Sequence, residues 1–231
     1  MQERFNCFSR EHLNLKEEDM LYYSSLPLCA LDAIFSIRLD YYKQVVPVVE
    51  KMCETLDIPM LAANPSEMPT VKEQLTVSAF IQKLIDKDLW DVDKMTSITH
   101  AYKTAGAGQI LKTDAFIQFL NILVRHKIDT FQDLNSVENQ YNLGMELRAI
   151  KGQKESVSYF FMLAGDKYDV KVDTHLTRYA QRATGEANLT YQQIKDLYKN
   201  AAKAFSTETE EMTPRHFDHI VWNWQRNPKN K

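Results

Sequence analysis

Apolar residues recur every three to four positions along most of the chain, which is the spacing of one face of an α-helix. The segment 28–37 has few polar positions and predicts a buried helix. Alternating patterns that would predict β-strands do not reach a convincing length, so we expect an all-α fold. Further helices are predicted over the following ranges: 41–53, 71–85, 91–103, 113–126, 130–134, 137–148, 154–164, 172–184, 190–205 and 213–224.

Several helix ends carry residues typical of caps. Asp91 and Thr113 are predicted to cap the N-termini of their helices, and Pro214 suits a first helical position. Gly185 predicts the end of the helix over 172–184. The stretch 106–108 reads Gly-Ala-Gly, which predicts a helix stop rather than a phosphate-binding loop, because no strand precedes it.

The composition narrows the chemistry. A chain of 231 residues fits one large domain or two small lobes. Its 28 Lys and Arg against 31 Asp and Glu give a net charge of −3, unlike a strongly basic nucleic-acid binder. Cys7, Cys29 and Cys53 are few and widely spaced, so we expect no disulfide framework, no metal site and no iron–sulfur cluster. Six glycines predict no Gly-rich cofactor loop, and no cofactor is expected.

Hydropathy predicts neither a membrane span nor a signal-peptide core. We therefore expect an intracellular protein, cytoplasmic and nucleoid-associated if the source is bacterial, with no membrane partner. A monomer is the simplest expectation for its oligomeric state.

Two neighbouring stretches could carry chemistry. Residues 149–165 read as a helix end, a tight turn at Gly152 and a buried helix. A glycine turn before a helix exposes backbone N–H groups that suit a phosphate, and Lys151 and Lys154 would add charge. The second stretch, 172–178, places Asp173 at the start of the next helix.

Together these stretches resemble the helix-hairpin-helix DNA glycosylase superfamily. Ile150-Lys151-Gly152-Gln153-Lys154 stands where the family has its glycine hairpin, and Val172-Asp173-Thr174-His175 resembles its aspartate motif. An apolar residue and an arginine follow the aspartate in the family, as Leu176 and Arg178 do here. The specific resemblance covers about thirty residues of 231; weaker likeness extends to 31–36 and 213–224.

Departures from the family refine the expected reaction. Lys154 stands where the family usually has a second hairpin glycine. Ser156 stands where bifunctional members carry a nucleophilic lysine, so a hydrolytic, monofunctional glycosylase is expected.

The resemblance implies two helical lobes with a cleft between them, one formed by residues 1–37 with 166–231 and the other by 38–165. It implies that Asp173 is catalytic and stabilises the sugar cation as the base leaves. The implied partner is duplex DNA with a damaged or modified base, flipped out of the helix as in base excision repair. Residues expected to contact that DNA are Lys151, Gly152, Gln153, Lys154, Ser156, His175 and Arg178.

Other interpretations remain open from sequence. Asp173 could be an N-cap and nothing more. Residues 148–182 hold seven Lys and Arg against four Asp and Glu, which is either a phosphate-binding strip or a solvated surface. The protein could be a catalytically silent module that binds DNA or a protein, or a hydrolase of a free modified nucleoside. His216 and His219 have helical metal-ligand spacing but no obvious further ligands.

Overall fold

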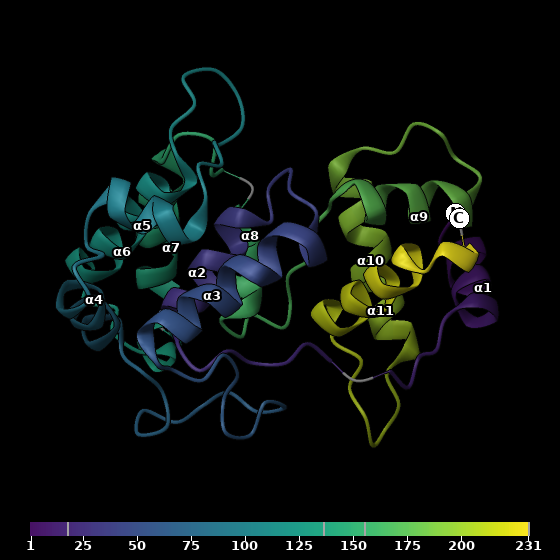
Figure 1. The fold of residues 1–231 in the computed structure, drawn as a ribbon. Helices are drawn as coiled ribbons and strands as arrows, with labels where there is room; N and C mark the ends of the chain where they lie inside the picture. The colour runs from purple at the N-terminus through teal and green to yellow at the C-terminus, as the bar shows by residue number, and fades with distance from the viewer. Residues whose placement is uncertain (18, 136, 155, 231) are drawn as a thin grey trace. The chain divides into compact units, whose positions relative to one another are not determined.

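The computed structural model of the protein describes residues 1–17, 19–135, 137–154 and 156–230. Within these ranges the regular structure is helical and no strand forms beyond two isolated bridges (Figure 1). The all-α class predicted from the sequence is confirmed. The helices are α1 (Gln2–His12), α2 (Leu26–Phe35), the π-helix η1 (Tyr41–Val45), α3 (Val46–Leu56), α4 (Val77–Asp86), α5 (Val92–Thr99), α6 (Lys112–Arg125), the 3₁₀ helix η2 (Phe131–Asn135), α7 (Val137–Ala149), α8 (Ser156–Leu163), α9 (Thr174–Thr184), α10 (Tyr191–Phe205), α11 (Pro214–Arg226) and the 3₁₀ helix η3 (Pro228–Asn230).

The chain divides into two units. The first comprises Met1–Met20 with Asp166–Lys231, and the second comprises Leu21–Gly165. The sequence prediction extended the N-terminal part of the first unit to residue 37, and this differs from the structure. Helix α2 belongs to the second unit because it packs against α3, α4, α6 and α8 there.

Helix α2 is the centre of the second unit. All ten of its residues are buried, which explains why its sequence has almost no polar face. Two side-chain interactions lie at its C-terminal end, and the second of them satisfies backbone carbonyls. The Ser36 hydroxyl donates to the Asp32 carboxylate at 2.7 Å. The ammonium group of Lys112, buried at the start of α6, donates to the carbonyl of Ile37 at 2.9 Å and to that of Ile34.

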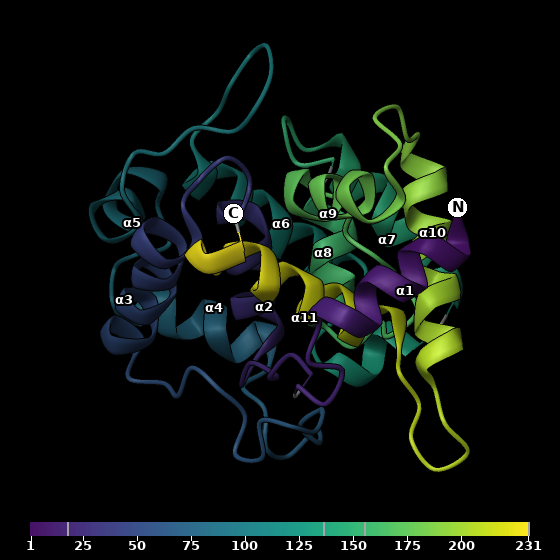
Figure 2. The same cartoon turned by 90° about the vertical axis from the view of Figure 1, so that its right-hand side faces the viewer.

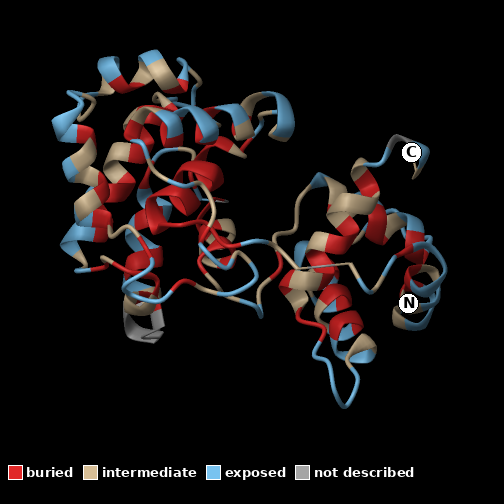
Figure 3. Ribbon diagram, turned by 60° about the horizontal axis from the view of Figure 1, so that its bottom comes forward, coloured by how far each residue is buried: buried red, intermediate tan, exposed pale blue. Residues whose placement is uncertain are grey.

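The first unit packs α1 against α9 and α10, and α11 against the same pair (Figures 1 and 2). Its core is aromatic. Phe5 is fully buried, and its ring meets those of Tyr179, Tyr198 and Phe217 at tilted or edge-on angles, with centroids 5.3–6.1 Å apart. In each unit the buried residues line the inward sides of the helices (Figure 3).

Capping residues mark several of the helix boundaries. Asp91 caps α5 through its carboxylate, which accepts from the backbone N–H groups of Asp93 and Lys94. Pro214 opens α11, and Gly185 ends α9 in the left-handed region with φ of 76°. These three predictions are confirmed.

Helix α1 was not predicted from the sequence, and the helix predicted over 71–85 begins only at Val77, as α4. Two further boundary predictions were also wrong. Helix α6 begins at Lys112 with Leu111 at the cap position, and the Thr113 side chain is buried instead. Its hydroxyl hydrogen-bonds to that of Thr99 at 2.7 Å, so a tertiary partner outweighs the capping role. Helix α5 already ends at Thr99, which leaves Gly106 in a loop rather than at a helix end.

Over the residues that the structure describes, no helix combines the length and the apolar character needed to cross a membrane.

Candidate functional site

Asp173 is held at the N-terminus of α9 by one of its two carboxylate oxygens. Oδ1 accepts hydrogen bonds from the backbone N–H groups of His175 at 2.7 Å and Leu176 at 2.9 Å. Oδ2 has no hydrogen-bond partner among the described residues, and the side chain is half-buried. Asp173 is therefore an N-cap, and its second oxygen is also available to a ligand or a water.

A second carboxyl group, on Asp218 of α11, supports the segment that leads into Asp173. Its side chain is buried, and Oδ2 accepts from the backbone N–H of Lys171 at 2.8 Å. Burial raises the pKa of Asp218 well above its ordinary value; the Lys171 N–H opposes that shift and the nearby charge of Asp173 adds to it. Asp218 thus helps to fix the chain just before Asp173, and the charge of Asp173 in turn favours the protonated form of Asp218.

Sequence reasoning missed Asp218, although a signal was present. Residues Phe217, Ile220 and Val221 mark the buried face of α11, and Asp218 lies on that same face. A carboxyl group on the apolar face of an amphipathic helix needs a specific partner, because an unpaired buried charge is costly.

The other residues predicted near Asp173 lie on the surface formed by α9 and α11. His175 is half-buried, with its ring centroid 6.3 Å from that of Trp222. The guanidinium of Arg226 lies 4.5 Å from the Trp222 ring, an arrangement typical of a cation–π contact. Arg178 is exposed on α9. This side of the first unit therefore combines positive charge with exposed or half-buried rings.

The hairpin residues lie in the second unit, between α7 and α8. Gly152 has φ of 72°, and a Cβ atom there would lie 2.4 Å from the carbonyl oxygen of Ala105. Both the backbone conformation and the close approach of the 104–105 segment therefore require glycine. Lys151 and Lys154 are exposed on either side of the turn.

Gln153 and Ser156 point inward rather than toward solvent. Gln153 is fully buried, and neither its side-chain oxygen nor its nitrogen has a hydrogen-bond partner in the described ranges. Ser156 is also buried, and its hydroxyl donates to the Gln153 carbonyl at 2.7 Å. Of the five residues predicted here to contact DNA, only Lys151 and Lys154 present exposed side chains.

The predicted site residues thus form two groups, one in each unit. Asp173, His175 and Arg178 belong to the first unit, whereas Lys151–Ser156 belong to the second. The cleft expected between the lobes remains a prediction.

The two histidines of α11 have structural partners. His216 Nε2 contacts the Glu17 carbonyl at 2.5 Å, and His219 Nε2 contacts the Asn223 amide nitrogen at 3.1 Å. Burial lowers the pKa of His219. In the part of the chain that is described, no group of three or more His, Cys, Asp or Glu side chains is arranged to hold a metal ion.

Comparison with protein families gives one match, and it extends over nearly the whole chain. The family described as "Domain of unknown function (DUF8548)" matches residues 4–226. The chain belongs to this family. The DUF8548 match covers all of the second unit and most of the first, and it includes Asp173 and the hairpin. Neither the curated proteins nor the solved structures yielded a match.

Proposed function

We propose that this DUF8548 protein hydrolyses the N-glycosidic bond of a damaged or modified base flipped out of duplex DNA. The observation that carries the proposal is the geometry of Asp173. One oxygen is fixed by two backbone N–H groups at the start of α9, and the other has no partner among the described residues. It stands in an Asp-Thr-His segment followed by Arg178, as in the helix-hairpin-helix glycosylases that the sequence resembles.

The chemistry asked of Asp173 is electrostatic. As the bond between the base and the sugar breaks, its electron pair leaves with the base and positive charge develops on the sugar. A carboxylate with a fixed orientation stabilises that charge, and Oδ2 can accept a proton from the water that attacks the sugar. Asp218 supports the reaction indirectly, because its hydrogen bond to the Lys171 N–H fixes the chain two residues before Asp173.

The absence of a lysine at position 156 supports hydrolysis over Schiff-base chemistry. Ser156 is buried and its hydroxyl is engaged with the Gln153 carbonyl, so it offers no amine and no exposed nucleophile. In the proposed two-lobed arrangement, the α7–turn–α8 segment binds the DNA backbone. Lys151 and Lys154 are the side chains exposed to do so.

The test is a screen of duplexes that carry different modified bases, scored for alkali-labile abasic sites, with the Asp173→Asn variant alongside. Asparagine caps a helix about as well as aspartate, so the variant keeps α9 but loses the charge. We expect release to fall by about 10²–10⁴-fold with duplex binding retained. An Asp196→Asn variant, altered at an exposed carboxylate of α10, should release base like the unaltered protein. Undiminished base release by Asp173→Asn would contradict the proposed catalytic role of Asp173.

A second candidate is a silent helix-hairpin-helix module, favoured by the departures at the turn. Lys154 occupies the position of the second hairpin glycine, and the net charge is −3. Such a module would bind duplex DNA with a steep dependence on salt and release no base from any substrate in the screen.

A further inference from the structure

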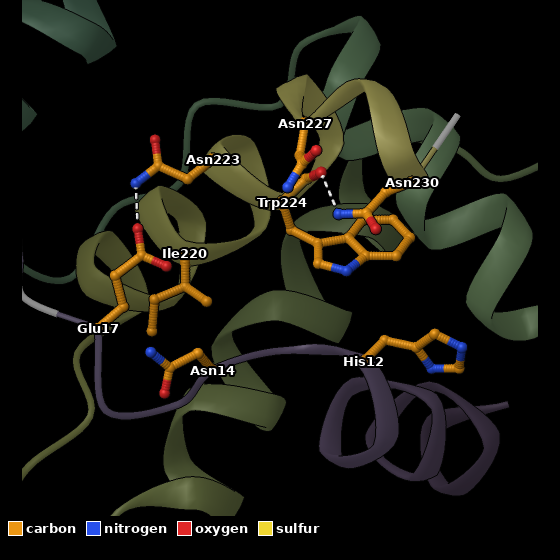
Figure 4. A pocket seen from close by; sticks show the side chains of 8 residues that line it. All are labelled: His12, Asn14, Glu17, Ile220, Asn223, Trp224, Asn227 and Asn230. Atoms are coloured by element: carbon orange, nitrogen blue, oxygen red, sulfur yellow. Dashed lines mark hydrogen bonds between the residues drawn. The ribbon is translucent and has the colours of Figure 1, made fainter.

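The first unit contains a pocket that the proposed reaction does not use. It lies between the segment after α1 and the C-terminal half of α11 with η3, and its volume is about 320 Å³ (Figure 4). This is the lower end of the size range for small-molecule sites. Eight residues line it: His12, Asn14, Glu17, Ile220, Asn223, Trp224, Asn227 and Asn230.

The lining is dominated by primary amides, and two of them are held in place. The Asn223 amide nitrogen donates to the Glu17 carboxylate and contacts His219 at 3.1 Å. The Asn230 amide nitrogen donates to the Trp224 carbonyl at 2.9 Å. Both contacts leave the side-chain oxygens of these asparagines without a partner among the described residues (Figure 4). Hydrogen-bonding groups of fixed orientation are therefore available to a ligand.

Asn14 supplies the complementary group. It is exposed, and its oxygen accepts from the Lys16 backbone N–H at 3.3 Å, which leaves the amide nitrogen as a donor. The pocket therefore offers unpartnered amide acceptors and an unpartnered amide donor, counted over the described residues.

Trp224 provides a flat wall whose orientation is fixed by its neighbours. The guanidinium of Arg182 lies 5.3 Å from the ring centroid, and Phe8 and Tyr179 meet the indole edge-on. Arg182 also donates to the Asn230 carbonyl at 2.7 Å, so it ties η3 to the indole. A rigid aromatic surface favours stacking by a planar ligand.

The same lining disfavours other ligand classes. No lysine or arginine is among the eight residues, and the Glu17 carboxylate would repel a phosphate or carboxylate. Ile220 and the indole are the only large apolar side chains in the lining, which is too little apolar surface for a lipid chain.

We propose that this pocket binds an uncharged purine base, with adenine as the best match. Adenine carries an amino donor beside ring-nitrogen acceptors, which match the amide oxygens of Asn223 and Asn230 and the amide nitrogen of Asn14. The base would stack on the indole of Trp224. The base could belong to a free nucleoside or to an unpaired position in a DNA strand. Asp173 is not among the residues that line the pocket, and the proposal does not depend on the proposed reaction.

The experiment is isothermal titration calorimetry of the full-length chain with adenosine, with cytidine, and with a thymine oligonucleotide that contains one adenine. Asn223→Ala removes a held acceptor, and the exposed Asn14→Ala removes the donor with little risk to folding. Asn200→Ala, at an exposed asparagine of α10 outside the pocket, is the matched control. We expect adenine binding about tenfold weaker or worse in the two pocket variants and unchanged in the control.

The two ligand arms identify the source of the base. Binding of adenosine that weakens in the pocket variants supports a free-nucleoside site. Binding of the oligonucleotide alone, with the same response to the variants, supports a site for a base on a strand. The proposal is overturned if neither adenine ligand binds, if the pocket variants bind like the control, or if cytidine binds as well as adenosine. Base release in the Asp173 assay is read independently of all these outcomes.

Discussion

The buried carboxyl group of Asp218 makes the stability of the first unit depend on pH. Its side chain accepts a hydrogen bond from the backbone N–H of Lys171, just before α9, and lies near the charge of Asp173. Replacing it with asparagine keeps an oxygen that can accept the same hydrogen bond, but removes the titrating proton. The variant therefore isolates the cost of ionising this group in the folded protein.

The sign of the effect follows from the raised pKa of Asp218. Below the ordinary pKa of 3.8 the group is protonated in both the folded and the unfolded chain, and it costs nothing. Above that pH the unfolded chain ionises while the folded chain holds its proton. The free energy of unfolding then falls by about 1.4 kcal/mol per pH unit until the pH passes the raised pKa. The Asp218→Asn variant lacks this loss.

We expect the free energy of unfolding of Asp218→Asn, minus that of the parent, to increase with pH from about pH 4 upward. Urea titrations at several pH values, followed by tryptophan fluorescence, measure this difference. They use a Trp90→Phe background so that the remaining indoles, Trp222 and Trp224, both report on the first unit. Asp196→Asn, at an exposed carboxylate of the same unit, should follow the parent at every pH. A difference between Asp218→Asn and the parent that does not change with pH would refute the reasoning.

Two further predictions concern the second unit. Gly152→Ala and Gly106→Ala both place a side chain at positive φ, but nothing lies within 4 Å of a Cβ at Gly106. In urea unfolding, we expect Gly106→Ala to lower the free energy of unfolding by about 1–2 kcal/mol. Gly152→Ala should lower it by about 1–3 kcal/mol more, because its Cβ meets the 104–105 segment. Equal losses of stability in the two variants would show that the 104–105 segment moves aside to accommodate the Cβ at position 152. Lys112→Met leaves the carbonyls at the end of α2 without their charged donor. Thermal unfolding followed by circular dichroism should show a stability lower by about 1.5–3 kcal/mol. An unchanged midpoint of unfolding would mean that water replaces the ammonium group.

The fold class and most helix boundaries could be predicted from sequence because both depend on local information. Helical periodicity needs only the spacing of apolar residues, and the caps at Asp91 and Gly185 act within one turn of their own helix. Thr113 shows the limit of this reasoning. Its hydroxyl has a partner in Thr99, fourteen residues earlier, and no local pattern reveals that contact.

The candidate site divides in the same way. For Asp173 the sequence left an N-cap role open beside the predicted catalytic one. The structure shows the cap through two N–H donors, and the catalytic role stays a prediction. Asp218 and the burial of Gln153 were not foreseen, because each depends on which helices pack together. The division at residue 20 rather than 37 has the same origin, since a helix that is apolar on all sides does not reveal which core it enters.

The order of segments along the chain has a consequence for folding during synthesis. Helix α1 packs on α9 and α10, yet the 145 residues of the second unit, Leu21–Gly165, separate it from them. Because a ribosome adds about 5–20 residues per second, α1 waits on the order of ten seconds for its partners. During that wait its apolar side, with Phe5 at the centre, has no native partner and is a natural target for a chaperone. The second unit is contiguous in sequence, so it can complete its core before the first unit begins to fold.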